Sequence, residues 1–381
     1  MQKTFDEVVL FARTGLNPRQ NFKLGQGNNY YITIKNIKNN SLVIDDNTDV
    51  VNDEAIKLIH KRSQIKKGDI LFASIGRMGD MYIIEEEPMA WDINESVFAF
   101  TLDTSIVRQK YFYYIFRVKS TLDYLESNSS GSTFKSIKMN QLKKMKFEIP
   151  ALDKQDQIVS VLDKICNVIE MRKQELGSLD DLIKARFVEM FGDSASNEKG
   201  WKMNTFGDIC TVRQGLQIPI SKRLTEYEED SYEYITVQYL HGGKEKEYIK
   251  SPKESVKCTK DDILMTRTGN TGMVVTNVEG VFHNNFFLID FDRERFEKDF
   301  LVEYLNLDLI QADITRRAGT STIPDLNHGE FYKIKVFEPP IDLQKEFYEF
   351  KMQVDKSKVA VQKALDETQT LFDSLMQEYF G

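Results

Sequence analysis

An internal duplication constrains the fold of this chain more than any other feature of its sequence. Residues 150–155 read PALDKQ and residues 339–344 read PPIDLQ, at a spacing of 189 residues. At the same spacing, EMFG at 189–192 returns as EYFG at 378–381. Solenoid repeats are far shorter, at roughly 20–50 residues. The sequence therefore predicts the tandem duplication of a whole domain.

The duplication extends upstream into regions of mixed character. GDIL at 68–71, followed by Gly76 and Gly79, matches DDIL at 261–264, followed by Gly269 and Gly272. Apolar runs that are typical of buried strands, and longer periodic runs that are typical of helices, also occur in both copies. We expect strands at 97–100 and 286–289, and helices at 108–125 and 301–317.

Each copy is predicted to be a mixed block of strands, helices and loops followed by one long helix. The predicted fold class is α+β, with two tandem mixed α/β domains. The predicted segments are a first block at 1–149, a central helix at 150–193, a second block at 194–338 and a C-terminal helix at 339–381.

The two helical segments carry apolar seams. Between Ile158 and Ile183, seam positions step by four and three, which is the period of a coiled coil, and all of them are apolar except Arg172. The second seam, from Phe347 to Tyr379, is interrupted by Lys358 and Thr368. We expect the helices to pair with each other as an antiparallel coiled coil, giving a pseudo-twofold molecule. The alternative is that each helix packs only on its own block.

The charge is unevenly divided along the chain. The chain has 51 basic and 59 acidic residues and a formal net charge of −8. The segments 153–193 and 341–381 together hold −6 of this charge, while residues 1–152 carry +3 and residues 194–340 carry −5. Phosphate binding needs local positive charge. The first block could present a basic face, and the second could do so only locally.

Several classes of protein are disfavoured by what the sequence lacks. Its three cysteines and four histidines are widely spaced, which argues against a disulfide framework and a metal site. No apolar run could span a bilayer, and the N-terminus lacks the apolar core of a signal peptide. We expect a cytoplasmic protein that does not interact with a membrane.

The familiar motifs of nucleotide and cofactor sites are also missing. The sequence contains neither a Walker A motif nor a G-x-G-x-x-G after a strand. Glu338-Pro339-Pro340-Ile341 lacks the amide and the aromatic residue of a loop that holds a flipped base. We expect this chain to have no catalytic activity of its own and to bind neither S-adenosylmethionine nor ATP.

Three loops in each copy are candidates for contact with a ligand. The GxxG turn occupies 74–79 and 267–272, the Gly-Ser loop 129–135 and 316–322, and the Arg-Gly loop 13–20 and 213–217. Glycines let backbone amides approach phosphate, while Arg, Asn and Gln suit base edges. Hydroxyls and lysines suit phosphate. Ordinary turns with solvated polar residues are the competing interpretation.

The candidate DNA-contacting residues are the polar side chains of these loops and the lysines that follow them. They are Arg13, Arg19, Gln20, Arg77, Thr133, Lys135, Lys138, Arg213, Gln217, Arg267, Thr268, Asn270, Thr271, Arg316, Arg317 and Thr322.

These features together resemble the specificity subunit of a type I restriction-modification enzyme. The resemblance covers essentially the whole chain. It is strongest from IPALDKQ at 149–155 through LDKI at 162–165 to FVEMFGD at 187–193, and in the repeat of this segment at the C-terminus. Two departures are the absence, at the start of the first block, of the Trp and Gly found in WKMNTFG at 201–207, and the acidic second block.

The resemblance implies that each block is a target-recognition domain that reads half of a bipartite site in double-stranded DNA. It implies two modification subunits that carry S-adenosylmethionine and methylate adenine, and a restriction subunit, where one is used, that carries ATP and Mg²⁺. The helices would be a spacer and the docking surface for these subunits. The spacer residues are Ile158, Leu162, Ile165, Leu176, Leu179, Ile183, Phe187, Phe191, Phe347, Val354, Leu365, Phe372 and Phe380.

Two other functions remain open at this point. The net acidic charge favours a non-catalytic scaffold with two protein-interaction modules. GxxG loops also clamp RNA backbone in KH domains, although the segments around them here are typical of strand-turn-strand.

Overall fold

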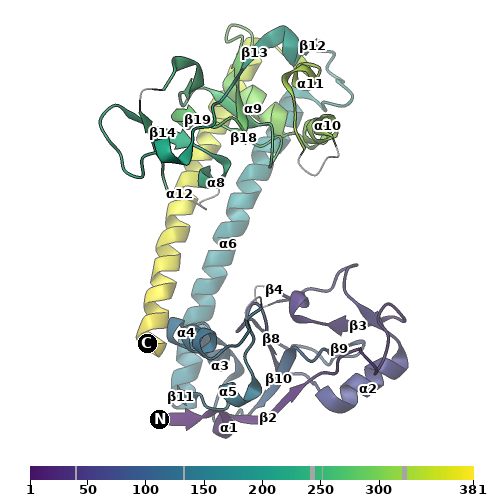
Figure 1. Ribbon diagram of the computed structural model, residues 1–381. Coiled ribbons are helices and arrows are strands. Elements are labelled where there is room, and N and C mark those ends of the chain that lie inside the picture. Colours follow the sequence, from purple (N-terminus) through teal and green to yellow (C-terminus); the bar gives the residue numbers. More distant parts are fainter. Residues whose placement is uncertain (39–40, 132–133, 241–244, 251, 320–323) are drawn as a thin grey trace. The chain divides into compact units, whose positions relative to one another are not determined.

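The computed structural model describes residues 1–381 except 39–40, 132–133, 241–244, 251 and 320–323. It divides into two compact units. Unit 1 comprises residues 1–173 and 363–381, and unit 2 comprises residues 174–362. Each unit therefore contains one block and a half of each long helix (Figure 1). The division into the four predicted segments stays a prediction.

The block of unit 1 is built around a four-stranded antiparallel sheet in the order β2-β10-β7-β8. Two smaller sheets, β1-β11 and β6-β3-β9, and the hairpin β4-β5 complete it. Its strands are β1 (Gln2–Thr4), β2 (Val9–Thr14), β3 (Asn29–Ile32), β4 (Ile37–Lys38), β5 (Ser41–Leu42), β6 (Val50–Val51), β7 (Ile70–Ala73), β8 (Met81–Ile83), β9 (Trp91–Ile93), β10 (Val97–Leu102) and β11 (Lys146–Glu148). Its helices are α1 (Phe5–Val8), α2 (Asp53–Ser63), α3 (Gln109–Ile115), α4 (Lys119–Ser127) and α5 (Met139–Leu142), with a 3-10 turn η1 (Ile34–Asn36).

The block of unit 2 repeats this topology. Its central sheet has the order β13-β20-β17-β18, its end strands pair as β12-β21, and a third sheet has the order β15-β14-β19-β16. Its strands are β12 (Lys202–Thr205), β13 (Cys210–Gln214), β14 (Ser231–Ile235), β15 (Tyr248–Lys250), β16 (Lys257–Cys258), β17 (Ile263–Thr266), β18 (Val274–Val275), β19 (Gly280–Phe282), β20 (Phe286–Phe291) and β21 (Lys335–Glu338). Its helices are α7 (Phe206–Ile209), α8 (Val237–Leu240), α9 (Lys298–Asn306), α10 (Asp308–Ala318) and α11 (His328–Tyr332), with 3-10 turns η2 (Ile220–Lys222) and η3 (Glu254–Val256).

The prediction of one continuous helix at 108–125 and one at 301–317 was wrong. Each stretch contains two helices, α3 and α4 in unit 1 and α9 and α10 in unit 2. Val118 and Leu307, the residues before the second helices, have ψ values of 141° and 137°, which lie outside the helical region. Neither break has a proline or glycine to signal it. Val118 is buried in the block's core, so tertiary packing sets the bend.

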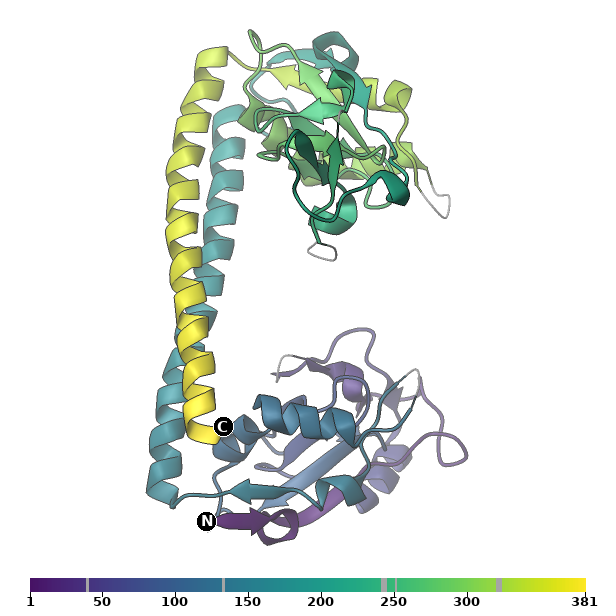
Figure 2. The ribbon, with the colours of Figure 1, turned by 60° about the vertical axis from the view of Figure 1, so that its left-hand side comes forward.

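The long helices are α6 (Leu152–Phe191) and α12 (Ile341–Phe380), which lie alongside each other (Figure 2). In unit 1, Ile158 and Leu162 near the start of α6 share a core with Phe372 near the end of α12. In unit 2, Phe187 near the end of α6 contacts Phe347 near the start of α12, with ring centroids 5.3 Å apart. The predicted antiparallel pairing is confirmed. Each helix also packs on the block in its unit, so the two packing alternatives occur together.

A buried glutamine fixes the start of each long helix and explains the repeated PALDKQ and PPIDLQ segments. Gln155 accepts a hydrogen bond from the backbone N–H of Arg108 at 2.8 Å and donates to the carbonyls of Ile106 and Pro150, both at 2.8 Å. Gln344 makes the equivalent three bonds, accepting from the N–H of Glu297 and donating to carbonyls at 295 and 339. A buried amide is stable only when its donors and acceptor are satisfied. The repeated segments thus form the same set of hydrogen bonds between block and long helix in both units, which we call the glutamine joint.

Among the helices in the described parts of the chain, none is both long enough and apolar enough to cross a membrane.

Candidate nucleic-acid interface

The central sheet of unit 1 brings two of the predicted loops to one end. β2 and β7 both pair antiparallel with β10, so both strands finish where β10 begins. Gly15, directly after β2, donates its N–H to the carbonyl of Asn94 at 3.2 Å. Ser74, directly after β7, donates its N–H to the carbonyl of Ser96 at 3.1 Å. The Arg-Gly loop and the GxxG turn therefore leave the sheet side by side.

The Gly-Ser loop of unit 1 joins the same end through backbone hydrogen bonds. Gly76 donates its N–H to the carbonyl of Lys135 at 3.1 Å, and Ile137 donates to the carbonyl of Ser74 at 2.9 Å. Three loops that are far apart in sequence thus form one continuous edge. We call this set of loops the loop edge.

Unit 2 builds the same loop edge with different residues. Gly215 donates its N–H to the carbonyl of Phe286 at 3.2 Å, and Arg267 donates its N–H to the carbonyl of Asn285 at 2.7 Å. Leu326, which follows the Gly-Ser loop, donates its N–H to the carbonyl of Arg267 at 2.9 Å. The sequence match between the loops therefore reflects a match in their placement within each unit.

The GxxG turns have the same backbone conformation in both units. The φ angles of Gly76 and Gly79 are 71° and 94°, and those of Gly269 and Gly272 are 83° and 92°. Residues with side chains rarely adopt this region, so both glycines of each turn are required by the backbone. A Cβ on Gly272 would also lie 2.9 Å from the side chain of Ile314 on α10.

The cationic side chains at the loop edge of unit 1 are accessible. Arg77 is 54% exposed, donates from Nη2 to the carbonyl of Ile37 at 2.8 Å, and lies 3.3 Å from the carboxylate of Asp80. Lys135 is exposed and pairs with Glu126 at 2.5 Å, and this hydrogen bond lowers the pKa of the Glu126 carboxyl. The other predicted residues of this edge are also exposed, namely Arg19, Gln20 and Lys138.

Arg13 belongs to the interior of its block. Its guanidinium donates to the buried carboxylate of Asp69 at 2.8 Å and to the carbonyl of Gln64 at 2.7 Å, and it also contacts the hydroxyl of Thr101. Asp69 precedes the start of β7, so the side chain points toward the opposite end of the sheet from the loop edge. These contacts assign Arg13 to packing within the block.

The corresponding residues of unit 2 are more often committed to partners. Arg267 is 19% exposed and forms two hydrogen bonds with Asp325, at 3.0 and 2.7 Å. Arg317 pairs with Asp313 at 2.8 Å and with Glu330 at 3.3 Å. Cationic side chains that could reach a phosphate are therefore scarcer at this edge.

The remaining predicted residues of unit 2 vary in exposure. Arg213 donates to the carbonyl of Ser255 at 3.1 Å, and the hydroxyl of Thr271 donates to the carbonyl of Pro324 at 3.2 Å. Thr268 is half-buried, while Gln217, Asn270 and Arg316 are exposed. The predicted Thr133 and Thr322 lie outside the described residues.

Two residues of the loop edge escaped the sequence analysis. Asp325 occupies the place of Ser136 in the other copy, since each forms a bridge to the second residue after a central strand, and it holds Arg267. Phe134 is 71% exposed beside Lys135. The repeat alignment could have identified Asp325. No local pattern distinguishes the exposed Phe134 from a core phenylalanine.

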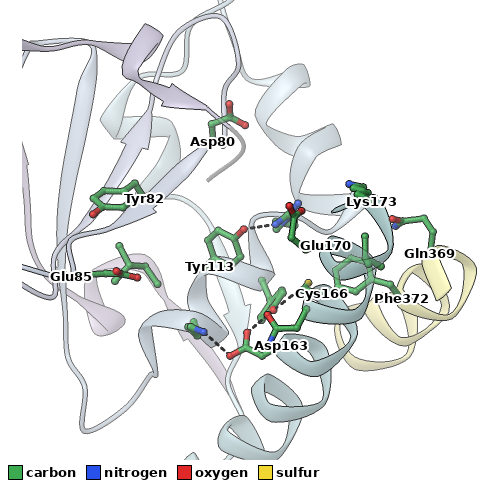
Figure 3. Close-up of a pocket in the computed structure, with 16 residues that line it drawn as sticks. Asp80, Tyr82, Glu85, Tyr113, Asp163, Cys166, Glu170, Lys173, Gln369 and Phe372 are labelled. Atoms are coloured by element: carbon green, nitrogen blue, oxygen red, sulfur yellow. Dashed lines mark hydrogen bonds and ion pairs between the residues drawn. The ribbon is translucent and has the colours of Figure 1, made fainter. Parts of the chain in front are cut away.

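A concavity in unit 1 adjoins the loop edge, because Asp80, the ion-pair partner of Arg77, is among its lining residues. It encloses about 720 Å³, and Tyr113 on α3, Asp163 and Cys166 on α6, and Phe372 on α12 are among its lining residues (Figure 3). Asp163 accepts hydrogen bonds from Lys110 at 2.6 Å and from the hydroxyl of Tyr114 at 2.8 Å. Acidic and basic side chains alternate along its wall, so it does not favour an anion. In the described ranges, no group of His, Cys, Asp and Glu could hold a metal ion.

The predicted spacer residues mostly face the interior of their own unit. Eight of them are buried, namely Ile158, Leu162, Ile183, Phe187, Phe191, Phe347, Val354 and Phe372, and Ile165, Leu176, Leu179, Leu365 and Phe380 are half-buried. A different set of apolar side chains is exposed on the long helices, including Val161, Val168 and Met171 on α6, and Tyr348, Met352 and Val359 on α12. The buried seam therefore serves helix pairing, and the exposed set is the surface open to a partner.

Comparison with known proteins gives a consistent result. The family model for the type I restriction modification DNA specificity domain matches residues 2–180 and again residues 198–368. The type I restriction enzyme MjaIX specificity subunit of Methanocaldococcus jannaschii is 29% identical over 152 residues, which cover 36% of this chain and 35% of that protein. A putative type I restriction enzyme specificity subunit of Haemophilus influenzae is 33% identical over 104 residues, which cover 27% of this chain and 26% of that protein. The matches thus span about a third or less of these relatives.

Two solved structures share the fold. The S subunit of a type I restriction-modification system from M. genitalium is 17% identical, with a TM-score of 0.57 over 100% of this chain and 96% of that chain. A second structure, described as the structural basis of complex assembly and conformational transition of the type I restriction-modification system, is 14% identical. Its TM-score is 0.59 over 99% of this chain and 96% of that chain.

Proposed function

This chain belongs to the family of type I restriction modification DNA specificity domains, and from that premise we propose that it reads a bipartite site in double-stranded DNA. Each block would read one half-site. The observation that carries this proposal is the loop edge, because the same three loops meet at one end of the central sheet in both units. Sequence is read by side chains that reach base edges, while cations hold the phosphates.

We further propose that catalysis resides on partner proteins. Two modification subunits would bring S-adenosylmethionine and methylate adenine, and a restriction subunit, where one is present, would bring ATP and Mg²⁺. This chain would bind none of these cofactors by itself and would act in the cytoplasm, where its DNA substrate lies. Calorimetry of the purified chain with S-adenosylmethionine or ATP should show no stoichiometric binding.

The modification subunits are proposed to dock on the exposed apolar side chains of the long helices. Met171 is 63% exposed on α6 and Val359 is 70% exposed on α12. Both side chains lie outside the buried seam and are available for contact with a partner. Changing both Met171 and Val359 to Lys should weaken co-purification of a modification subunit without changing retention on duplex DNA. Leu309→Lys is the matched control, because Leu309 is an exposed apolar residue of a block helix, α10.

The decisive experiment is methylome sequencing of a methylation-free host that expresses this chain with its modification subunit. We expect methylated adenines within one two-part motif with a fixed gap. A host that stays unmethylated, while the purified complex shows no salt-sensitive retention on duplex DNA, would instead support the protein scaffold. Nucleic-acid binding that depends on phosphate contacts must weaken as salt rises.

A further inference from the structure

We propose that one position of the GxxG turn is a base-reading position in both units, with Arg77 reading guanine in one half-site and Asn270 reading adenine in the other. The inference rests on the proposed function and goes beyond it, because it names the reading residues and the base that each selects. It is carried by the equivalence of the two turns, by the exposure of these two side chains, and by the burial of Arg13 and Arg267.

The two residues occupy the same point of the same turn. Arg77 follows Gly76 between β7 and β8, and Asn270 follows Gly269 between β17 and β18. The preceding glycines have φ angles of 71° and 83°, so the backbone presents both side chains in the same way within their units. The structural counterpart of Arg77 is therefore Asn270, and Arg267 is the counterpart of Ser74.

Both side chains are accessible, although Arg77 also donates a hydrogen bond to the carbonyl of Ile37 at 2.8 Å. Arg77 is more than half exposed, and its pair with Asp80 three residues later is of the exposed kind that contributes little to stability. Asn270 is exposed, and its amide nitrogen lies 3.7 Å from the sulfur of Met273, which is a poor acceptor. DNA could replace the contacts with Asp80 and Met273 at small cost.

Two other arginines that the sequence analysis proposed, Arg13 and Arg267, are held in place. Arg267 forms two hydrogen bonds with Asp325 and is mostly buried, and Arg13 is bound inside its block by Asp69. Asp325 lies just after the Gly-Ser loop, so its pair with Arg267 joins that loop to the GxxG turn. Arg267 is thus a positioning residue for the loop edge of unit 2.

The chemistry of the two side chains selects different bases. A guanidinium offers two parallel N–H donors, which match the O6 and N7 acceptors of guanine in the major groove. The Asn amide offers one donor and one acceptor, which match N7 and the N6 amino group of adenine. Exchanging the bases would set acceptor against acceptor or donor against donor. The discrimination expected for such a bidentate contact is roughly fivefold to 150-fold.

The test is reciprocal exchange at this position, read by methylome sequencing of the chain with its modification subunit. In Arg77→Asn, one guanine of one half-site should be replaced by adenine, and the other half-site should be unchanged. In Asn270→Arg, one adenine of the other half-site should become guanine. Met78→Thr, which copies the next residue of the second turn, is the matched control and should leave the motif intact.

A binding selection from randomised duplex DNA with the purified complex covers variants that fail to methylate. The base preferred at one position should change in the same direction as in the methylome. As a second readout, 7-deazaguanine at the guanine assigned to Arg77 should weaken binding of the unaltered chain and leave Arg77→Asn unaffected, because N7 is one of the two acceptors.

The outcomes separate the two proposals. An unaltered chain that methylates a bipartite motif, together with exchange variants that keep the same bases, would overturn the base assignment and leave the proposed function standing. An unaltered chain without any bipartite motif would overturn the proposed function itself. A shift in the motif of Arg267→Lys, with none in Asn270→Arg, would also overturn the assignment.

Discussion

The two units hold their blocks against their long helices with opposite charges at equivalent places. In unit 1, Lys110 on α3 contacts Asp163 on α6 at 2.6 Å. In unit 2, Asp299 on α9 contacts Lys351 on α12, also at 2.6 Å. At the repeat spacing of 189 residues, Lys110 corresponds to Asp299. The cation is supplied by the block in one unit and by the helix in the other.

The surroundings of these two ion pairs differ as well. Lys110 is 57% exposed, whereas Lys351 is 13% exposed and also faces Glu303 at 3.6 Å. Burial raises the pKa of the Glu303 carboxyl, and Lys351 opposes that rise. The comparison teaches that the two halves of a duplicated fold can hold block and helix together with ion pairs of reversed polarity and different burial.

The largest expected effect comes from removing the buried cation of unit 2. Lys351→Met leaves the carboxylates of Asp299 and Glu303 buried without a counter-charge, which should cost about 3–5 kcal/mol of the free energy of unfolding. Urea unfolding at neutral pH measures this loss. Lys356→Met is the control, because Lys356 is an exposed lysine on the same helix. Equal losses in the two variants would show that the buried pair is unimportant.

The glutamine joint should behave alike in the two units. Gln155→Leu and Gln344→Leu each leave one backbone N–H donor and two backbone carbonyls without their side-chain partner. Each variant should therefore lower the free energy of unfolding by about 1–3 kcal/mol. The same urea experiment applies to both. If only one variant lost much of its free energy of unfolding, the two glutamines would not contribute equally to stability.

Breaking the exposed pair of unit 1 should have a smaller effect. Lys110→Met removes an ion pair whose lysine is well solvated and whose aspartate keeps the hydrogen bond from Tyr114, so we expect a loss below about 1 kcal/mol. High salt should reduce the difference further, because solvent-exposed charges are screened. If Lys110→Met lowered the free energy of unfolding as much as Lys351→Met, the two ion pairs would not differ in the way proposed.

The last expected effect is a change in acid sensitivity. The hydrogen bond from Arg295 lowers the pKa of the Glu338 carboxyl to about 2, from an ordinary value of 4.5. Its stabilising contribution is therefore complete above pH 4.5 and is lost as the pH falls from 4.5 to about 2. Glu338→Gln should flatten the decline in thermal stability over that interval. Glu148→Gln, at the equivalent place in β11 and 74% exposed, should keep the decline of the unaltered chain.

The sequence by itself determined the features that depend on local pattern. The spacing of 189 residues predicted the duplication, and apolar steps of four and three predicted the long helices and their pairing. The paired glycines predicted the GxxG turns, because the positive φ angles at Gly76 and Gly269 are a local requirement of the backbone. The signals for the helices and the turns lie within a few residues of the features that they specify, whereas the duplication is visible from the sequence alone because the same short segments recur.

Only the tertiary structure decided which side chains are available and where the shorter helices break. Arg13 and Arg267 have the same residue type as Arg77, but each is held by a carboxylate 56 or 58 residues away in the sequence. The breaks before α4 and α10 likewise lack any local signal. Long-range partners set both outcomes, because the free energy of an ion pair or of a buried side chain depends on what the fold places beside it.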